Sequence, residues 1–386
     1  MIYLDYNATT PCDRRVLEAM EPFLKERFEN PSSLYRGSRE NKKAIEQARQ
    51  QVARLLSCAP EEIFFTSGGT EADNWAIKST AWALREKGNH IITSSIEHHA
   101  VLNTCAFLVK QGFRITYLPV SAEGIVDLEV LKKAISRETI LVTIMHANNE
   151  IGTIQPLTEI AGLLKEKGIL FHTDAVQTAG KLPLSVKELG VDMLSLSGHK
   201  FYGPKGVGAL YVRKGWRLPP LLHGGEQEHG RRAGTENVAG IVGLGEAARL
   251  AKEEMAEEAV RVRALRDKLE EKIRQSVPEV IFNGHREKRL YNTANLCVKY
   301  VEGESMLLHL DFEGICASSG SACTSGSLEP SHVLLALGLP HEVAHGSLRF
   351  SLGKYSTESD VEAVAAVLPE IVAKLRAMSP LWPKER

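Results

Sequence analysis

The chain has 386 residues, of which 43% are hydrophobic and 25% are charged, the balance of an ordinary globular protein. Its 47 basic and 48 acidic residues nearly cancel, which argues against a nucleic-acid-binding or membrane-surface protein. No uncharged apolar stretch is long enough to span a bilayer, and residues 1–5 lack the pattern of a secretory signal. We therefore expect a cytoplasmic protein with a large buried core and more than one domain.

Short apolar strands alternate with helical patterns from about residue 60 to residue 215. Strands are predicted at residues 63–66, 90–94, 114–118, 140–145, 170–173, 193–196 and 209–212, and helices at residues 71–87, 100–111, 128–136 and 157–167. This alternation predicts an α/β fold, with a mostly parallel seven-stranded sheet between helices. In such sheets ligands bind beyond the carboxyl ends of the strands.

A long charged helix is predicted next, over residues 238–275, and we interpret it as the arm between two domains. Beyond it the pattern is α+β. Strands are predicted at residues 293–299 and 347–352, and helices at residues 303–310 and 357–377. We expect a large domain over residues 15–255. A smaller domain would combine residues 1–14 with residues 256–386 and would carry a loop at about residues 318–330.

Lys200 lies between two predicted strands, among small residues, a serine and a histidine. Partial burial lowers the pKa of a lysine and makes its neutral amine a nucleophile. Such an amine forms Schiff bases, most commonly with pyridoxal phosphate. The alternative is a lysine in a surface turn, so the remaining motifs must decide between the two interpretations.

Two segments suit the phosphate and the ring of that cofactor. After the strand at 63–66, a glycine turn leads into a helix at Gly69 and Thr70, and a helix start binds phosphate. Asp174 ends the strand at 170–173, where a carboxylate can hold the pyridine nitrogen protonated. Gln177 could donate to the phenolic oxygen of the ring. Helix capping is the plainer explanation of the threonine and of the aspartate.

Two further polar segments also follow predicted strands. His98 and His99 are both candidates for stacking on the ring and moving protons, and their spacing does not choose between them. The amides of residues 145–152 could bind a substrate carboxylate or the ring, although a polar turn is the alternative. Because these segments and Lys200 all follow strands of one sheet, we expect them at the same sheet edge.

Taken together, these motifs resemble the group I cysteine desulfurases, the NifS/IscS family of fold-type I pyridoxal phosphate-dependent transferases. The resemblance runs from residues 3–10 to residues 347–353. Its motifs are Ser-Gly-Gly-Thr-Glu (67–71), His-Thr-Asp-Ala-Val-Gln (172–177), Ser-Gly-His-Lys (197–200), Arg-Ala-Gly-Thr-Glu-Asn (232–237) and Ser-Ser-Gly-Ser-Ala-Cys-Thr-Ser-Gly (318–326).

The resemblance implies a role for each matching residue. Lys200 would form the Schiff base, His98 would stack on the ring, and Asp174 and Gln177 would contact its nitrogen and phenolic oxygen. Thr235 would reach the phosphate of a neighbouring subunit, which implies a homodimer. The implied phosphate cradle is Gly69, Thr70, Ser197 and His199. Asn149 and Arg349 would grip the substrate carboxylate, since a planar guanidinium pairs with it bidentately, and Asn149 would also contact the cofactor.

Cys323 distinguishes a desulfurase from other enzymes of this fold. The chain has six scattered cysteines and no Cys-x-x-Cys pair, which argues against a disulfide framework or structural zinc. Cys323 lies in a small, polar segment that predicts an exposed loop, and an exposed thiol is a candidate nucleophile. Four others, Cys12, Cys58, Cys105 and Cys297, have helix- or strand-like surroundings and are interpreted as small hydrophobes. No resident metal is expected, although Cys323 could ligate an iron–sulfur cluster transiently.

The implied reaction removes sulfur from L-cysteine, which gives L-alanine and a persulfide on Cys323 that passes to acceptors for iron–sulfur cluster or other sulfur-cofactor assembly. An aminotransferase or another lyase of this fold would need no such cysteine. A selenocysteine lyase is chemically close, and a sulfur-relay docking scaffold is the alternative from a different class. The sequence leaves the sulfur acceptor open.

Overall fold

A computed structural model describes residues 1–319 and 329–383 of the chain. Its main sheet has seven strands in the order β2-β8-β7-β6-β5-β3-β4. These are β2 (Ile63–Thr66), β3 (His90–Ser94), β4 (Arg114–Leu118), β5 (Thr139–Thr143), β6 (Leu170–Asp174), β7 (Met193–Ser197) and β8 (Gly208–Val212). Only β8 runs antiparallel to its neighbours. The predicted mostly parallel α/β sheet is confirmed, with strand ends that differ by one or two residues.

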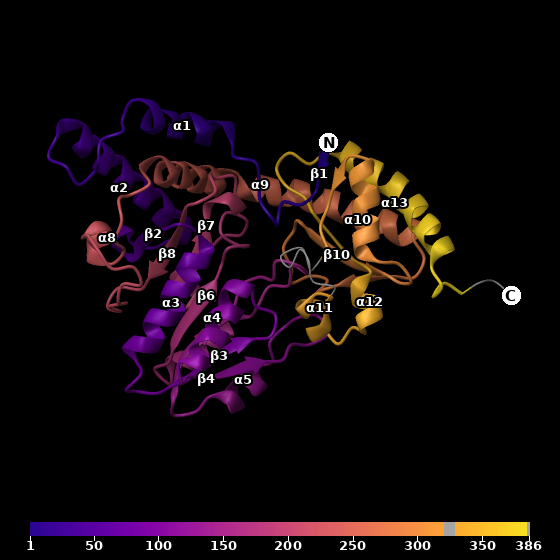
Figure 1. Cartoon of the computed structure of the whole chain (residues 1–386), viewed down its shortest axis with the longest axis horizontal. Helices are drawn as coiled ribbons and strands as arrows, with labels where there is room; N and C mark the ends of the chain where they lie inside the picture. The colour runs from indigo at the N-terminus through magenta and orange to yellow at the C-terminus, as the bar shows by residue number, and fades with distance from the viewer. Residues whose placement is uncertain (320–328, 384–386) are drawn as a thin grey trace.

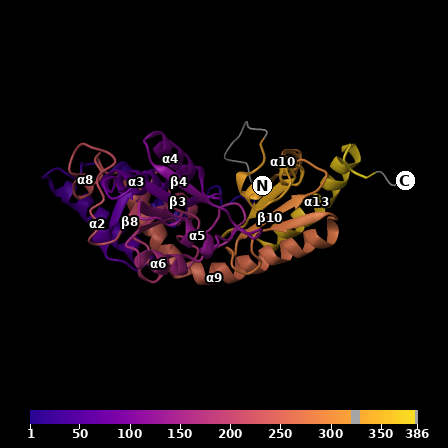
Figure 2. The same ribbon diagram turned by 90° about the horizontal axis from the view of Figure 1, so that it is seen from below.

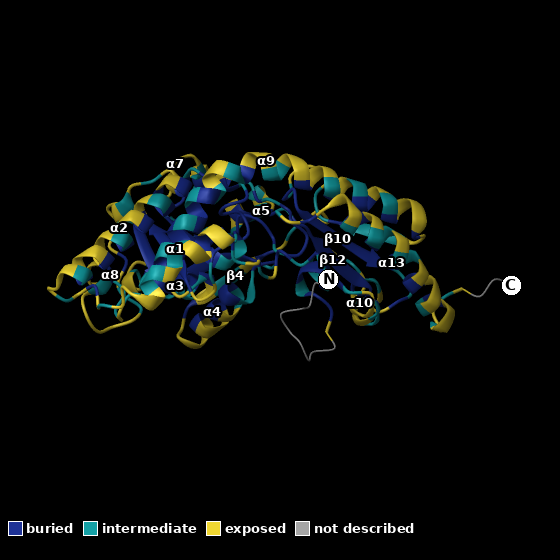
Figure 3. Cartoon of the chain, turned by 90° about the horizontal axis from the view of Figure 1, so that it is seen from above, coloured by how far each residue is buried: buried dark blue, intermediate teal, exposed yellow. Residues whose placement is uncertain are grey.

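Successive strand residues point to opposite sides of the sheet, so apolar side chains lie on both of its faces. Helices cover both faces and bury these side chains. Ile63 and Phe65 of β2 pack into one core, whereas Phe64 between them packs into another. The first core lies under α2 (Arg36–Leu56), α6 (Leu157–Lys165) and the start of α9 (Val238–Ser276); the second lies under α3 (Gly69–Ala83) and α4 (His99–Lys110). Figure 3 shows the buried strands beneath helices whose outer faces are exposed.

A second, smaller α+β region contains an antiparallel sheet in the order β12-β10-β9. Its elements are β9 (Val280–Asn283), β10 (Thr293–Val298), α10 (Gly303–Phe312), β11 (Ile315–Cys316), β12 (Ser347–Ser351) and α13 (Glu358–Met378). The N-terminal strand β1 (Ile2–Tyr3) pairs in parallel with β11, so the start of the chain packs with this region, as expected.

Helix α9 links the two regions and runs along both of them (Figures 1 and 2). Its residues up to Met255 belong to the core of the main sheet, and those from Val262 onward belong to the core of the small sheet. This change of core lies close to the predicted domain boundary at 255/256, but the boundaries themselves stay a prediction.

The remaining helices are short or lie outside the two sheets. They are α1 (Arg14–Lys25), α5 (Leu128–Ala134), α7 (Val186–Leu189), α8 (Gln227–Gly230), α11 (His332–Ala336) and α12 (His341–His345), with two short 3-10 turns, η1 (Pro60–Glu62) and η2 (Gly198–Lys200). Within residues 1–319 and 329–383, no helix combines the length and apolarity needed to cross a membrane.

Candidate active site

A cavity of about 280 Å³ lies at the carboxyl edge of the parallel strands, where the two regions meet. Ten of the residues predicted from sequence line it: Gly69, Thr70, His98, Asn149, Asp174, Gln177, Ser197, His199, Lys200 and Arg349. They come from the ends of β3, β5, β6 and β7, the start of α3, and β12. The structure therefore brings together nearly the whole predicted set at the edge where ligands of α/β sheets bind.

Lys200 ends the 3-10 turn η2 directly after β7, and its side chain is half-buried in the cavity wall. Its Nζ donates to the carbonyl oxygens of Asn7 at 2.7 Å and Ala8 at 2.8 Å. These contacts hold the amine at the cavity even though it comes from a turn, and an amine held at a cavity wall can react with a bound aldehyde.

Asp174 ends β6, Gln177 follows it, and both line the same cavity. Asp174 is buried, and its Oδ1 accepts a hydrogen bond from the Val176 backbone N–H at 2.8 Å. Burial raises the pKa of Asp174 to about 6, while that N–H and the nearby Lys200 act to lower it. A cationic ring nitrogen beside this carboxylate would favour its ionised form further.

His98 rather than His99 lines the cavity. Its Nδ1 accepts a hydrogen bond from the Ala100 backbone N–H at 3.1 Å, so a neutral ring carries its proton on Nε2. Burial and the nearby Lys200 lower the pKa of His98 to about 4. The imidazole is therefore neutral at physiological pH and can donate a hydrogen bond from Nε2.

The start of helix α3 forms a cradle for an anion. Gly68 caps the helix, and the first backbone N–H groups of α3 lie at the cavity with the Thr70 side chain. A Cβ added to Gly69 would lie 2.6 Å from Cγ2 of Val176, so a larger residue would close this approach. The amine, the buried carboxylate and this helix start fit the aldehyde, the ring nitrogen and the phosphate of pyridoxal phosphate.

Arg349 enters from β12 in the small region and has only 5% of its surface exposed. Nη1 donates to the Asn149 carbonyl oxygen at 3.0 Å, and Nη2 donates to Asp5 Oδ1 at 2.6 Å. Its buried Nε has no hydrogen-bond partner among the described residues. A buried guanidinium with an unused donor at a cavity wall suits a ligand carboxylate.

One described residue of the predicted set lies elsewhere. Thr235 is exposed, in the segment between α8 and α9, and is not among the described residues that line the cavity. Cys323 lies outside the described residues.

Sequence reasoning missed Asn7 and Asp73, which also line the cavity. The Asn7 carbonyl oxygen accepts from both Lys200 and Gln177, and its Nδ2 donates to the Asn149 carbonyl oxygen at 3.1 Å. Asp73 lies on α3 one turn after Thr70 and is buried. The helical spacing from Thr70 was a signal for Asp73, but an aspartate in a helix usually faces solvent.

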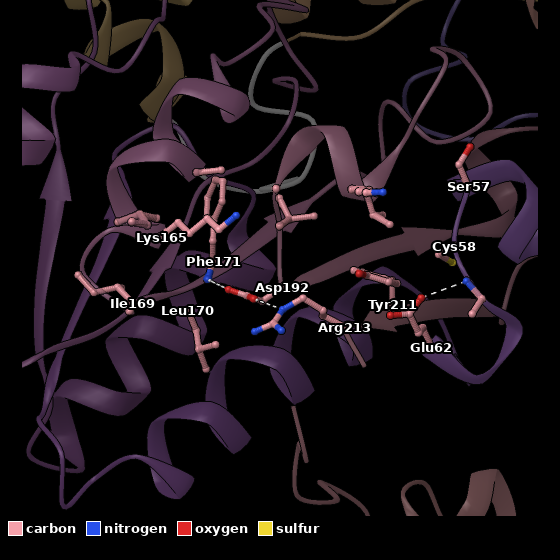
Figure 4. A pocket seen from close by; sticks show the side chains of 18 residues that line it. Ser57, Cys58, Glu62, Lys165, Ile169, Leu170, Phe171, Asp192, Tyr211 and Arg213 are labelled. Carbon is pink, nitrogen blue, oxygen red and sulfur yellow. Dashed lines mark hydrogen bonds and ion pairs between the residues drawn. The ribbon is translucent and has the colours of Figure 1, made fainter. Parts of the chain in front are cut away.

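A second cavity, of about 680 Å³, opens at the opposite edge of the sheet, where β6 and β7 begin. Figure 4 shows Asp192 between Phe171 and Arg213. Asp192 accepts from the Phe171 backbone N–H at 2.8 Å and from Arg213 Nε at 2.6 Å, so its carboxylate is already paired within the protein. We therefore place the active site in the smaller cavity, at the carboxyl edge.

Comparison with known proteins agrees with this geometry. The family model for class-V aminotransferases matches residues 2–364. Cysteine desulfurase IscS of Dictyoglomus turgidum is 58% identical over 379 residues, covering 98% of this chain and 96% of that protein. IscS of Methanosarcina thermophila is also 58% identical, covering 100% of this chain and 95% of that protein.

Solved structures give the same result. A NifS-like protein superposes with a TM-score of 0.91 at 42% identity, covering 97% of this chain and all of that one (100%). SspA in complex with cysteine superposes with a TM-score of 0.83, also at 42% identity, covering 92% of this chain and 100% of that one.

Fold and site together define a pyridoxal phosphate-dependent enzyme, and the chain belongs to the class-V aminotransferase family. Its near-full-length likeness to the IscS proteins makes it a cysteine desulfurase, which takes sulfur from L-cysteine.

Proposed function

We propose that Lys200, His98, Arg349 and Cys323 perform the desulfurase reaction together. The observation that supports this most strongly is the meeting of Lys200, Asp174 and the start of α3 with Arg349 in one cavity. Bound pyridoxal phosphate supplies the electron sink that makes the substrate Cα–H acidic and its C–S bond breakable. Its binding residues would be Gly69, Thr70, Ser197 and His199 at the phosphate and Asp174, Gln177, His98 and Asn149 at the ring.

In this proposal the cavity orients L-cysteine by its carboxylate. Arg349 and Asn149 hold that carboxylate, and the likeness to SspA, solved in complex with cysteine, supports cysteine as the ligand. The Lys200 amine then removes the Cα proton as a general base. Its two backbone acceptors, Asn7 and Ala8, orient the amine for that step.

Sulfur leaves the substrate in a separate step. The Cys323 thiolate attacks the substrate sulfur and the C–S bond breaks, so sulfur stays on Cys323 as a persulfide and the three-carbon product is released as alanine after protonation. In this proposal His98 takes up the proton of the substrate thiol, for which its ring must be neutral, and its lowered pKa keeps it so.

Two substitutions test these roles. Cys323→Ala should retain the visible absorbance of bound cofactor and lose alanine and sulfide formation, whereas Cys58→Ala removes a thiol at the opposite sheet edge and should retain both. Lys200→Ala should lose the absorbance that depends on the Schiff base, with exposed Lys205→Ala as the control. Undiminished sulfide release by Cys323→Ala would refute the role given to that thiol.

We also propose a homodimer in which Thr235 completes the partner's phosphate site. In support, Thr235 is exposed, and the connection between α1 and α2 exposes apolar side chains: Phe28 is 82% exposed, Leu34 90% and Tyr35 67%. Mixing Lys200→Ala with Thr235→Ala subunits tests it. If Thr235 serves the partner, the mixed dimer holds one intact site and regains activity. No regain would contradict this role.

The sulfur acceptor we propose is an iron–sulfur scaffold protein, in keeping with the IscS name of the relatives. Persulfide-loaded enzyme incubated with such a scaffold should lose its sulfur to the scaffold cysteines, measured by mass spectrometry of both proteins. Retention of the persulfide by the enzyme would contradict this acceptor.

A further inference from the structure

Asp73 is a buried acid in the cofactor cavity that the proposed mechanism does not use. It lies on α3, has 1% of its surface exposed, and lines the cavity together with Asp174. Its Oδ1 is buried without a hydrogen-bond partner among the described residues. An ionised carboxylate oxygen in that position would be costly, because burial of an unpaired charge is strongly unfavourable.

The nearest ring, that of His172, does not compensate such a charge. Its Nε2 lies 3.6 Å from Asp73 Oδ1, beyond hydrogen-bond distance. Both ring nitrogens already have partners, Thr143 Oγ1 at 2.8 Å and Ser195 Oγ at 2.9 Å. Complete burial lowers the pKa of His172 to about 3, so the imidazole is neutral. Asp73 thus faces a neutral ring and not a cation.

The groups around Asp73 and Asp174 affect the ionisation of the two carboxyl groups differently. Asp174 accepts a backbone N–H bond and lies near Lys200, and both favour its ionised form. Burial, Asp174 and Glu97 raise the pKa of Asp73 well above its usual value, and the Ser195 hydroxyl offsets this only in part. Two neighbouring buried carboxyl groups do not both ionise readily, so one of them retains the proton.

We propose that Asp73 is a neutral carboxylic acid in the folded protein. Because Asp73 holds the proton, Asp174 is the ionised carboxylate at the position of the ring nitrogen. Asp73 is then a positioning residue, because it acts on the cofactor only through Asp174. This inference rests on the proposed role of Asp174. The neutral acid keeps a second negative charge out of the cavity that it lines with Asp174.

The protonation state can be read in the cofactor-free protein by infrared spectroscopy. A neutral carboxylic acid has a C=O stretching band that an ionised carboxylate lacks. Glu97 is also buried, and burial raises its pKa to about 8, so Glu97→Gln should serve as the background in which the comparison is made. In that background, Asp73→Asn should remove a carboxylic-acid band at neutral pH, and Asp174→Asn should leave it in place.

The opposite pattern overturns the proposal. Loss of the band in Asp174→Asn and its survival in Asp73→Asn would place the proton on Asp174. Glu150, whose pKa burial raises to about 7, contributes a band of its own to every variant, so the comparison is made on difference spectra. A difference spectrum of Asp73→Asn without loss of a carboxylic-acid band would contradict the proposal. Because the measurement uses no cofactor and no turnover, its failure is distinct from a failure of the proposed function, which the Cys323 and Lys200 variants test.

Unfolding experiments give a second measurement. A carboxyl whose pKa is raised by folding stabilises most at low pH, and this contribution is lost as pH rises through the folded-state pKa. The denaturation midpoint of the wild-type protein should therefore fall relative to that of Asp73→Asn as pH rises. A difference in midpoint that does not change with pH would contradict the proposal. Asparagine matches the shape of a neutral aspartic acid, so an Asp73→Asn variant that does not fold would also contradict it.

Discussion

Ser318 and Arg349 exchange two backbone hydrogen bonds. The Ser318 N–H donates to the Arg349 carbonyl oxygen at 3.1 Å, and the Arg349 N–H donates to the Ser318 carbonyl oxygen at 2.6 Å. Cys323 follows Ser318 by five residues in the sequence, a stretch of chain that spans at most about 18 Å. Ser318, the described residue that precedes the segment of the proposed nucleophile, is therefore bridged to β12, the strand of the proposed carboxylate clamp.

The described residue Ser331, after this segment, is attached to the same site. Its Oγ donates to Oε2 of Glu150, the residue after Asn149. Burial raises the pKa of Glu150 to about 7, while Ser331 and Arg349 act to lower it. The described residues Ser318 and Ser331, on either side of this segment, thus contact residues at or next to the proposed substrate carboxylate site.

Arg349→Lys should weaken substrate binding more than turnover. Lysine keeps the charge but loses the planar fork and the unused Nε donor. Loss of a charged hydrogen bond costs about 1.5–3 kcal/mol, so we expect KM for L-cysteine to rise about tenfold or more with a smaller change in kcat. Steady-state kinetics measure both, with exposed Arg213→Lys as the control. An unchanged KM would argue against the clamp.

The free energy of unfolding should fall in acid because burial lowers the pKa of four histidines. Burial lowers the pKa of His98, His146 and His199 from 6.5 to about 4, and that of His172 from 6.5 to about 3. A lowered folded-state pKa means that the unfolded chain binds more protons, so stability is full above pH 6.5 and is lost as pH falls.

His146→Gln tests this directly, since His146 has no role in the proposed mechanism. The wild-type protein should lose up to about 3 kcal/mol from this one group between its two pKa values, and the variant should show a shallower decline in the free energy of unfolding. Urea denaturation at several pH values measures the slopes. Exposed His341→Gln should follow the wild type; an equally steep slope for His146→Gln would contradict the prediction.

Glu228 and Arg49 form a buried ion pair that holds the segment before Thr235 against α2. Their side chains are each 3% exposed, with Nη1–Oε2 and Nη2–Oε1 distances of 2.7 and 2.8 Å. Glu228→Gln leaves the guanidinium with only the part-exposed Glu46, whose Oε2 lies 3.3 Å from Arg49 Nε, and should cost about 3 kcal/mol of unfolding free energy. Chemical denaturation checks this against exposed Glu226→Gln; equal stabilities would contradict it.

The fold could be predicted because its strands are short, apolar and buried on both faces. β5, for example, has the sequence Thr-Ile-Leu-Val-Thr, and all five of its residues are buried. Local patterns failed where the two contacting residues are distant in sequence. Asn7 lies 193 residues from Lys200, and its carbonyl oxygen accepts a hydrogen bond from Lys200 Nζ. No periodicity reports such a bond.

Two smaller expectations were wrong. Cys12 and Cys58 lie in connections rather than inside a helix or strand, since α1 begins only at Arg14 and α2 ends at Leu56. Capping explains both cases: Asp13 accepts the Arg15 N–H at the start of α1, and Ser57 adopts a left-handed conformation that ends α2. Both thiols are half-buried, and burial raises the pKa of Cys58 to about 12.

Single-turnover mass spectrometry tests the central claim most directly. Holoenzyme mixed with one equivalent of L-cysteine, then alkylated without reductant and digested, should carry one additional sulfur atom on the peptide that contains Cys323, in an amount equal to the alanine formed. Additional sulfur on Cys316 or another cysteine, or pyruvate and ammonia with no persulfide, would contradict the account.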